Sequence, residues 1–280
     1  MRMDNRPPIQ PGDDDLRSSA CEMGEGDGPP IQLEKLHYLI NGDAILDGVD
    51  LTVQRGEIVA IMGRSGTGKT TVLRLIMGLI RPTSGSIRIR GTEITALGEQ
   101  ELGAVRANMG MVFQGAALFD SMTVGENVAF GLLEHRRLPV AEVTGRVQQL
   151  LEMVDMAETE DLLPAQLSGG MRKRVGIARA LALEPCIMLY DEPTAGLDPI
   201  SAAATDALIT RLRDRVGVTS LIVSHDVQSL RRISDRAAVL HRGRFLAVAP
   251  IAELERTSDE AISQFLSGSP DGPLSDKAGQ

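Results

Sequence analysis

One eight-residue segment constrains the possible folds of this chain more than any other: GRSGTGKT, residues Gly63–Thr70. It has the pattern G-x-x-x-x-G-K-[ST], in which glycines let the backbone curl around phosphate groups. The run before it, EIVAIMG, is typical of a strand buried in a sheet, and the run after it, KTTVLRLIMGL, has the apolar spacing of a helix. A flexible Gly-Ser turn is the weaker interpretation, because a buried strand, this loop and a helix occur in the order of a phosphate-binding α/β domain.

The residue types in this loop (the P-loop) indicate how it would bind a nucleoside triphosphate. Backbone N–H groups from about Gly66 to Thr71 would face the α- and β-phosphates. Lys69 is expected to reach the β- and γ-phosphates, and the Thr70 hydroxyl is expected to ligate Mg²⁺. The predicted ligands are therefore ATP and Mg²⁺. The predicted binding residues of this loop are Gly63, Arg64, Ser65, Gly66, Thr67, Gly68, Lys69, Thr70 and Thr71.

Two carboxylates follow a second apolar run, CIMLYDEP at Cys186–Pro193. Asp191 suits a ligand of Mg²⁺, either directly or through water, and Glu192 can act as the general base for an attacking water. Alone, an Asp-Glu pair after a strand could be an ordinary helix N-cap. With a phosphate-binding loop upstream, the metal and base roles are favoured.

A second glycine-rich turn, LSGGM at Leu167–Met171, precedes another helical run. Free backbone N–H groups and the helix dipole favour an anion at such a helix start. A single small domain has no evident need for two phosphate-binding sites. The second turn therefore suggests that its anion is bound by another chain.

Taken together, these segments resemble the ATP-binding cassette (ABC) ATPases. The resemblance covers about Ile31 to Pro250, and six elements occur in the order of that family: Gly63–Thr70, Gln114 in MVFQ, LSGGM, LYDEP, GLDP and His225 in SHD. It implies an α/β fold with a P-loop NTPase core of the ABC type, an inserted helical subdomain and an N-terminal antiparallel β subdomain.

The same resemblance implies a site shared between two copies of the chain. In that family two nucleotide-binding domains pack head to tail, and the signature loop of one covers the ATP held by the other. Ser168, Gly169 and Gly170 would then bind the γ-phosphate of the partner's ATP, which explains the second glycine-rich turn. Asp198 would contact the partner's P-loop; without the family it is a turn aspartate before Pro199.

Three further residues take roles from the resemblance. Gln114 would contact Mg²⁺ or the attacking water, and His225 would hydrogen-bond the γ-phosphate and orient Glu192. The family places an aromatic residue before the first long strand to stack on adenine, and Tyr38 is the candidate here. By spacing, however, the stacking position could fall on Ile40, and Tyr38 is equally plausible as a half-buried strand residue.

The chain divides into three parts by pattern. Residues 1–30 are rich in Pro, Gly and Asp and are expected to be a disordered tail. Residues 31–250 are expected to form the nucleotide-binding domain, in which strand-like runs flank a helical insertion at about 98–184. Residues 251–280 are expected to form a C-terminal helix, IAELERTSDEAISQFL, and then an extended tail.

Composition excludes several classes of function. The net charge of −9 and the 2% aromatic content argue against a protein that binds nucleic acid. Two cysteines, Cys21 and Cys186, give no disulfide framework and fit a reducing compartment. No run of eighteen apolar residues is present to span a bilayer.

Within the ABC family, the single cassette argues against translation factors, and the lack of a long coiled coil argues against chromosome-maintenance and repair ATPases. The resemblance therefore implies a separate ATPase subunit that docks on an integral-membrane permease at the cytoplasmic face of the inner (plasma) membrane. Apolar residues near Ala116 to Phe119 would form part of the groove that receives the permease.

Three details resemble the ATPase of MCE/Mla-type lipid transporters: Met171 where the family usually has Gln, the segment FQGAALFDSMTVGENVAFGLLEH, and the C-terminal QFLSGSPDGPL. The resemblance implies transport of phospholipids or other hydrophobic molecules. The implied partners are the permease, a second copy of the chain, an MCE-domain lipid-binding protein and, in some relatives, a STAS-domain subunit. It also implies that the C-terminal segment reaches the neighbouring ATPase, with Phe265 and Leu266 as anchors.

Two alternatives stay open at this point. The chain could be the ATPase subunit of an importer for amino acids or another polar solute. It could also be a nucleotide-switched regulatory module that rarely hydrolyses ATP, although Glu192 and His225 argue against that interpretation.

Overall fold

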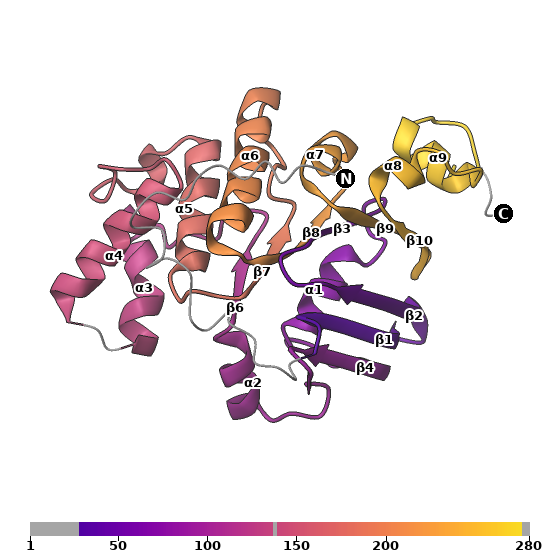
Figure 1. Ribbon diagram of the computed structural model, residues 1–280, viewed down its shortest axis with the longest axis horizontal. Helices are drawn as coiled ribbons and strands as arrows, with labels where there is room; N and C mark the ends of the chain where they lie inside the picture. Colours follow the sequence, from indigo (N-terminus) through magenta and orange to yellow (C-terminus); the bar gives the residue numbers. More distant parts are fainter. Residues whose placement is uncertain (1–27, 137–138, 276–280) are drawn as a thin grey trace, which may run out of the picture.

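The structure is a computed structural model that describes residues 28–136 and 139–275, so most of the predicted tail at 1–30 lies outside the described residues. Figure 1 shows two β-sheets and the helices that cover them. The first sheet is antiparallel, with strand order β2-β1-β4-β5. Its strands are β1 (Ile31–Ile40), β2 (Asp43–Val53), β4 (Ser84–Ile89) and β5 (Thr92–Glu93). It is the antiparallel subdomain that the sequence predicts.

The second sheet has the strand order β10-β9-β3-β8-β7-β6. Its strands are β3 (Ile58–Met62), β6 (Met109–Val112), β7 (Ile187–Asp191), β8 (Thr219–Ser224), β9 (Arg236–His241) and β10 (Arg244–Ala249). β10 pairs antiparallel with β9, and the other neighbours pair in parallel. Every residue of β3, β7 and β8 is buried, as expected of parallel strands that are covered on both faces.

The strand order brings the predicted motifs to one edge of this sheet. β3, β8 and β7 are neighbours and run in the same direction, so their carboxyl ends lie side by side. The P-loop follows β3, Asp191 ends β7 with Glu192 next, and His225 follows β8. β6 pairs with β7 and ends at Val112, two residues before Gln114.

The helices lie on both sides of the parallel sheet. In Figure 1, α3, α4 and α5 gather at the left, whereas α1 lies beside the antiparallel strands at the right. The helices of the nucleotide-binding region are α1 (Lys69–Ile76), α2 (Glu99–Arg106), α3 (Val124–Arg136), α4 (Val140–Met153), η3 (Pro164–Gln166), α5 (Gly169–Leu181), α6 (Pro199–Val216) and α7 (Val227–Ile233). Within the described ranges, no helix is both long and apolar enough to cross a membrane.

β3 separates two apolar cores, because alternate residues of a strand face opposite sides of a sheet. Ile58, Ala60 and Met62 belong to the core that includes side chains from α3 to α7. Val59 and Ile61 belong to the core formed with α1 and the antiparallel sheet. The strand that carries the P-loop is therefore fixed by packing on both faces.

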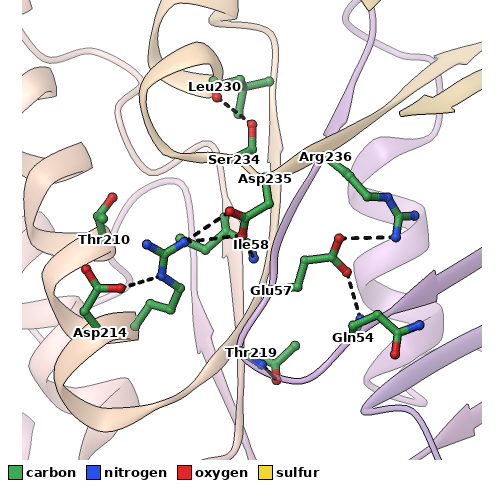
Figure 2. Close-up of polar contacts among 12 residues, drawn as sticks. Gln54, Glu57, Ile58, Thr210, Asp214, Thr219, Leu230, Ser234, Asp235 and Arg236 are labelled. Atoms are coloured by element: carbon green, nitrogen blue, oxygen red, sulfur yellow. Dashed lines mark hydrogen bonds and ion pairs between the residues drawn. The ribbon is translucent and has the colours of Figure 1, made fainter. Parts of the chain in front are cut away.

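Polar contacts fix the amino end of β3, opposite the P-loop (Figure 2). The Ile58 N–H donates to Asp235 Oδ2 at 2.8 Å, and Arg213 Nη1 lies 3.3 Å from the same oxygen. On the other side, Arg236 Nη1 lies 3.2 Å from Glu57 Oε1. These contacts join β3 to α6 and β9 and so hold the strand in register.

The stretch predicted as a helical insertion, about 98–184, contains a strand of the core sheet. β6 lies inside it and pairs with β7, so α2 is separated from α3, α4 and α5 by that strand. The run MGMV is too short for its apolar pattern to distinguish a strand from a helix, which is why the sequence did not separate it.

The C-terminal region differs from the predicted single helix. Up to residue 275, where the described part ends, it forms two short helices, α8 (Ile251–Leu254) and α9 (Glu260–Ser267). The break is caused by Asp259, whose carboxylate accepts hydrogen bonds from the N–H groups of Ala261 and Ile262 and so starts a new helix. Leu266 is buried in the core of its own chain, and Phe265 packs against the same core.

Candidate active site

The P-loop turns from β3 into α1 through positions that require glycine. Gly66 and Gly68 have φ angles of +81° and +99°, in the left-handed region that other residues rarely adopt. A Cβ atom on Gly63 would lie 2.5 Å from the Leu240 carbonyl oxygen of β9. The glycines of the motif therefore allow the tight curl that brings successive backbone N–H groups toward one point.

The Lys69 side chain lies inside its own loop and is 7% exposed. Its Nζ donates to the carbonyl oxygens of Gly63 at 2.8 Å and Arg64 at 3.1 Å. Burial lowers the pKa of Lys69 below its ordinary 10.5, whereas the nearby Glu192 and Asp191 carboxylates raise it. A phosphate would offer the ammonium group a charged acceptor in place of two neutral carbonyls.

Thr70 and Asp191 meet across 121 residues of sequence. The Thr70 hydroxyl donates to Asp191 Oδ1 at 3.1 Å, and Asp191 is 8% exposed. Burial raises the pKa of Asp191 above its ordinary 3.8, although the Thr70 hydrogen bond opposes this. Such a pair of oxygen ligands fits Mg²⁺, which takes one or two carboxylates and completes its shell with phosphates and water. No cluster of three or more His, Cys, Asp or Glu side chains that could hold a metal occurs in the described part of the chain.

Glu192 has an unusual backbone conformation, with a φ of +49°. For a residue with a Cβ atom this left-handed conformation is strained, and such strain is concentrated at functional sites. The Glu192 N–H donates to the Val223 carbonyl oxygen of β8 at 2.9 Å, and the residue is 9% exposed. The turn after β7 is therefore held against β8 with the carboxylate close to that strand's end.

Two side chains from the end of β8 orient the Glu192 carboxylate. His225 Nδ1 lies 2.9 Å from Glu192 Oε1, and the Ser224 hydroxyl donates to Glu192 Oε2 at 3.1 Å. The His225 side chain is 57% exposed, so it joins the buried carboxylate to the open side of the site. This geometry permits the two predicted residues to act together.

Gln114 lies on the loop after β6 (residues 113–117, the Q-loop) and is exposed. Its main-chain carbonyl accepts a hydrogen bond from Lys173 Nζ, and the same Nζ donates to the Glu192 carbonyl at 3.1 Å. The Q-loop main chain is thus tied to the turn that carries Glu192.

The LSGGM turn starts α5 as a capped helix. Ser168 is exposed, and its Oγ accepts a hydrogen bond from the Met171 N–H at 3.2 Å. Gly169 and Gly170 lie beside the start of α6: a Cβ on Gly169 would lie 3.4 Å from Leu197, and one on Gly170 would lie 3.7 Å from the Ser201 side chain. The partly buried Met171 packs against the helical core, so it differs in setting from the exposed Ser168.

Asp198 caps its own helix, α6. Its Oδ1 accepts from the N–H groups of Ile200 and Ser201 at 3.0 Å each, and the Ser201 hydroxyl donates to Oδ2. The hydrogen bond from Ser201 is the main cause that lowers the pKa of Asp198. The cap and the neighbouring signature glycines form one exposed surface.

A cavity of about 460 Å³ lies against the first half of the P-loop. It is lined by Arg64–Thr67, by Ala44 and Ile45, by the turn His241–Gly243 and by Pro273–Ser275. Tyr38 is not among these lining residues, because its half-buried side chain packs against the core of the antiparallel sheet. The neighbouring Ile40 is 45% exposed. Stacking of Tyr38 on adenine stays a prediction.

Two residues at the site are not evident from the sequence: Ser224 and Lys173. Ser224 directly precedes His225, and this position is a weak signal of a role in the site. A serine at the end of a strand, taken alone, indicates no function. Lys173 stands in a basic run, MRKR, that is typical of a solvated helix face. Only the packing of α5 against the Q-loop shows that this lysine is 5% exposed.

Comparisons with known proteins identify the family of this chain. The ABC transporter family model matches residues 46–195. Over 244 residues the chain is 41% identical to the intermembrane phospholipid transport system ATP-binding protein MlaF of Escherichia coli (strain K12), covering 87% of this chain and 91% of MlaF. Over 238 residues it is 40% identical to the methionine import ATP-binding protein MetN of Brucella abortus (strain 2308), covering 85% of this chain and 64% of MetN.

Solved structures of nucleotide-binding cassettes resemble this fold. The cassette MJ0796, in a dimeric post-hydrolysis state bound to ADP and Pi, superposes with a TM-score of 0.72 at 33% identity, covering 79% of this chain and 98% of that one. CbiO1 from Clostridium perfringens, part of the ABC transporter complex cbiONQ, gives a TM-score of 0.77 at 31% identity, covering 82% and 91%. Because the family model matches more than half of the chain and the relatives match most of it, the chain belongs to the ABC transporter family, as an ATP-binding subunit.

Proposed function

We propose that this chain is the ATP-hydrolysing subunit of a transporter that moves phospholipids or similar hydrophobic molecules between membranes. The observation that carries hydrolysis is the Glu192 carboxylate, which is oriented by His225 and Ser224 at the sheet edge that also holds Lys69. The lipid substrate is supported by relatives named for intermembrane phospholipid transport. The match to MlaF of Escherichia coli covers 91% of that protein.

Each residue of the site has a separate role in hydrolysis, which follows from its position. The P-loop N–H groups and Lys69 bind the phosphates, and Thr70 and Asp191 offer oxygen ligands to Mg²⁺. Mg²⁺, when bound, neutralises charge on the phosphates. Glu192 accepts a proton from the attacking water, and His225, whose Nδ1 is engaged with Glu192, has Nε2 left for the γ-phosphate. Gln114 would reach the metal or the water from the Q-loop.

The signature loop completes the site of a second copy. Ser168 is exposed at the start of α5, beside the capped start of α6 at Asp198. The backbone N–H groups at the start of α5 and the dipole of that helix favour an anion, which would come from outside this chain. We therefore assign Ser168, Gly169 and Gly170 to the γ-phosphate of the partner's ATP, and Asp198 to the partner's P-loop.

The remaining partners belong to the same proposal. An integral-membrane permease would bind the helical side near Phe119, which would place the chain at the cytoplasmic face of the inner membrane. Phe119 is 42% exposed and contacts Phe130, whereas Ala116, which was expected near the permease groove, is 1% exposed and packs in the interior. An MCE-domain lipid-binding protein and a STAS-domain subunit are the further partners proposed.

Substitution of the general base tests this function. In the chain assembled with its permease, Glu192→Gln keeps the side-chain shape but removes the base, so turnover should fall by about 10²–10⁴-fold while ATP stays bound. Lys69→Ala should instead weaken MgATP binding by roughly tenfold or more. ATPase assays and nucleotide-binding titrations measure both. The exposed Glu142→Gln on α4 is the matched control and should behave as the parent.

Parental turnover in Glu192→Gln would refute the assignment of the base. The two alternative functions predict different observations. Co-purification with a periplasmic solute-binding protein would favour a polar-solute importer, such as the one that the relative MetN serves. An assembled parent complex that binds ATP without turnover would favour a regulatory module.

A further inference from the structure

A lysine of the signature helix lies buried between two parts of the active site. Lys173, in the second turn of α5, is 5% exposed. Its ammonium group donates to the main-chain carbonyl of Gln114 in the Q-loop and, at 3.1 Å, to that of Glu192. One side chain therefore joins the helix that starts with the signature loop to both the Q-loop and the turn of the general base.

The same face of α5 holds the Q-loop at two further points. Arg179 donates to the carbonyl oxygens of Ala117 at 2.7 Å and Ala116 at 2.9 Å. Gly176 lies between, where an added Cβ would approach the Ala116 Cβ to 3.2 Å. Positions 173, 176 and 179 are spaced by three residues and so lie on one side of the helix. The Q-loop is thus clamped along α5, and its position follows that of α5.

Lys173 differs from Arg179 because it also contacts the strained turn at Glu192. A left-handed non-glycine residue persists only when its surroundings hold it in place. The Glu192 N–H is fixed by Val223 of β8, and the Glu192 carbonyl is the acceptor of Lys173. Without that donor, the turn keeps its attachment to β8 but loses its attachment to the helix and the Q-loop.

The ammonium group of Lys173 is buried close to two main-chain carbonyls and two carboxylates. A buried ammonium group is unfavourable unless anions or good acceptors lie close by. Burial lowers the pKa of Lys173, and the Glu192 and Asp191 carboxylates raise it. The Gln114 and Glu192 carbonyls and the two carboxylates therefore offset the cost of burying this ammonium group.

We propose that Lys173 is a positioning residue for ATP hydrolysis: it fixes the Glu192 turn only when the Q-loop lies against α5, and so links the general base to the helix that presents Ser168. This inference rests on the proposed role of Glu192 as base. Lys173 touches main-chain carbonyls and not the reacting atoms, so it acts through Glu192 and Gln114. A displacement of the Q-loop relative to α5 would therefore be passed through this one side chain to the main chain of Glu192.

The test uses the assembled transporter complex and the substitution Lys173→Met, which keeps the apolar stem but removes the donors. We expect kcat to fall by about tenfold or more, because the base is misplaced, while the affinity for MgATP changes by less than about threefold, because the P-loop is untouched. Lys173→Arg, which can donate to both carbonyls, should restore most of kcat. Arg174→Met is the matched control, since that neighbouring cation pairs with Asp155, away from the site.

A kcat within about twofold of the parent, or a loss of MgATP affinity equal to the loss of kcat without rescue by Lys173→Arg, would overturn the proposal in favour of a purely structural lysine. Should Lys173→Met lower Tm by more than about 5 °C, Lys173→Gln, whose shorter and uncharged side chain keeps an amide NH₂ group, replaces it in the same comparison. Glu192→Gln is measured alongside. If it retains turnover, the proposed function fails; if it is inactive and Lys173→Met is fully active, only the role of Lys173 fails.

Discussion

At the scale of single residues, the site places two buried lysines near the same two carboxylates. Lys69 approaches Asp191 and Glu192 from the P-loop, and Lys173 approaches them from α5. In both lysines burial lowers the pKa and the carboxylates raise it, so each ammonium group is held in balance by the acidic pair. A triphosphate that binds at the P-loop adds negative charge beside Lys69 and shifts that balance toward the charged form.

This balance predicts a pH dependence of nucleotide binding. The charged form of Lys69 binds phosphate, and its pKa in the free protein lies below the ordinary 10.5. MgATP affinity should therefore fall as pH rises through that lowered pKa, which is earlier than for a solvated lysine, and binding should take up protons there. Titration calorimetry in two buffers of different ionisation enthalpy measures the uptake. In Lys69→Arg, which stays charged, affinity should not change over the same range; a parallel fall would contradict the assignment.

Local chemistry explains which residues were predictable. The P-loop glycines, Lys69 and the Asp191–Glu192 pair follow directly from the strand endings, and the structure brings them to one edge. The contacts of Lys173 and Ser224 could not be predicted, because they depend on how α5 and β8 pack against the turn after β7. Tyr38 could not be decided either, because the hairpin between β1 and β2 contains register shifts that move side chains relative to spacing.

At the scale of elements, the segment between the Q-loop and α3 is shaped by one buried amide. Asn127 is fully buried and its Oδ1 accepts from the Phe119 N–H at 2.8 Å. Its Nδ2 donates to the carbonyl oxygens of Phe119, Met122 and Thr123. A loop without regular structure thus has its backbone groups satisfied by a helix residue, which fixes the exposed Phe119 beside the proposed permease surface.

Removal of that amide should destabilise the protein. Asn127→Ala leaves buried carbonyl and N–H groups without their partner, so the free energy of unfolding should fall by about 1–3 kcal/mol. Urea denaturation measures this difference. Gln166→Ala, which removes one exposed bond to the Leu163 N–H, should cost less than about 1 kcal/mol. Equal costs for the two substitutions would show that the Asn127 contacts do not shape the loop.

Element boundaries were the weaker part of the prediction from sequence. The strands around the P-loop were found because parallel core strands are continuous apolar runs. β6 was included in the helical insertion because four residues carry no period, and the C-terminal helix was predicted as one because the cap at Asp259 interrupts an otherwise helical pattern. Pairing with β7 decided the structure of β6, whereas a local cap decided where the last helix begins.

At the scale of the whole molecule, the exposed residues at the signature loop argue for a partner. Ser168 is exposed, and Ile200, at the start of α6, is 83% exposed, although it is apolar. Both lie beside Asp198 and the signature glycines, on one surface. An exposed apolar side chain beside a glycine-rich helix start fits an interface, and the dimeric cassette structures that this chain resembles are consistent with that use.

The most direct measurement pairs two defective chains in one complex. One chain carries Lys69→Ala and the other Ser168→Arg, both in the Glu192→Gln background so that ATP is retained. If each site is shared, one site of this mixed dimer has both defects, and the other combines an intact P-loop with an intact signature loop. We predict one tightly held MgATP per mixed dimer and none in either uniform dimer. A mixed dimer that holds none would contradict the shared site.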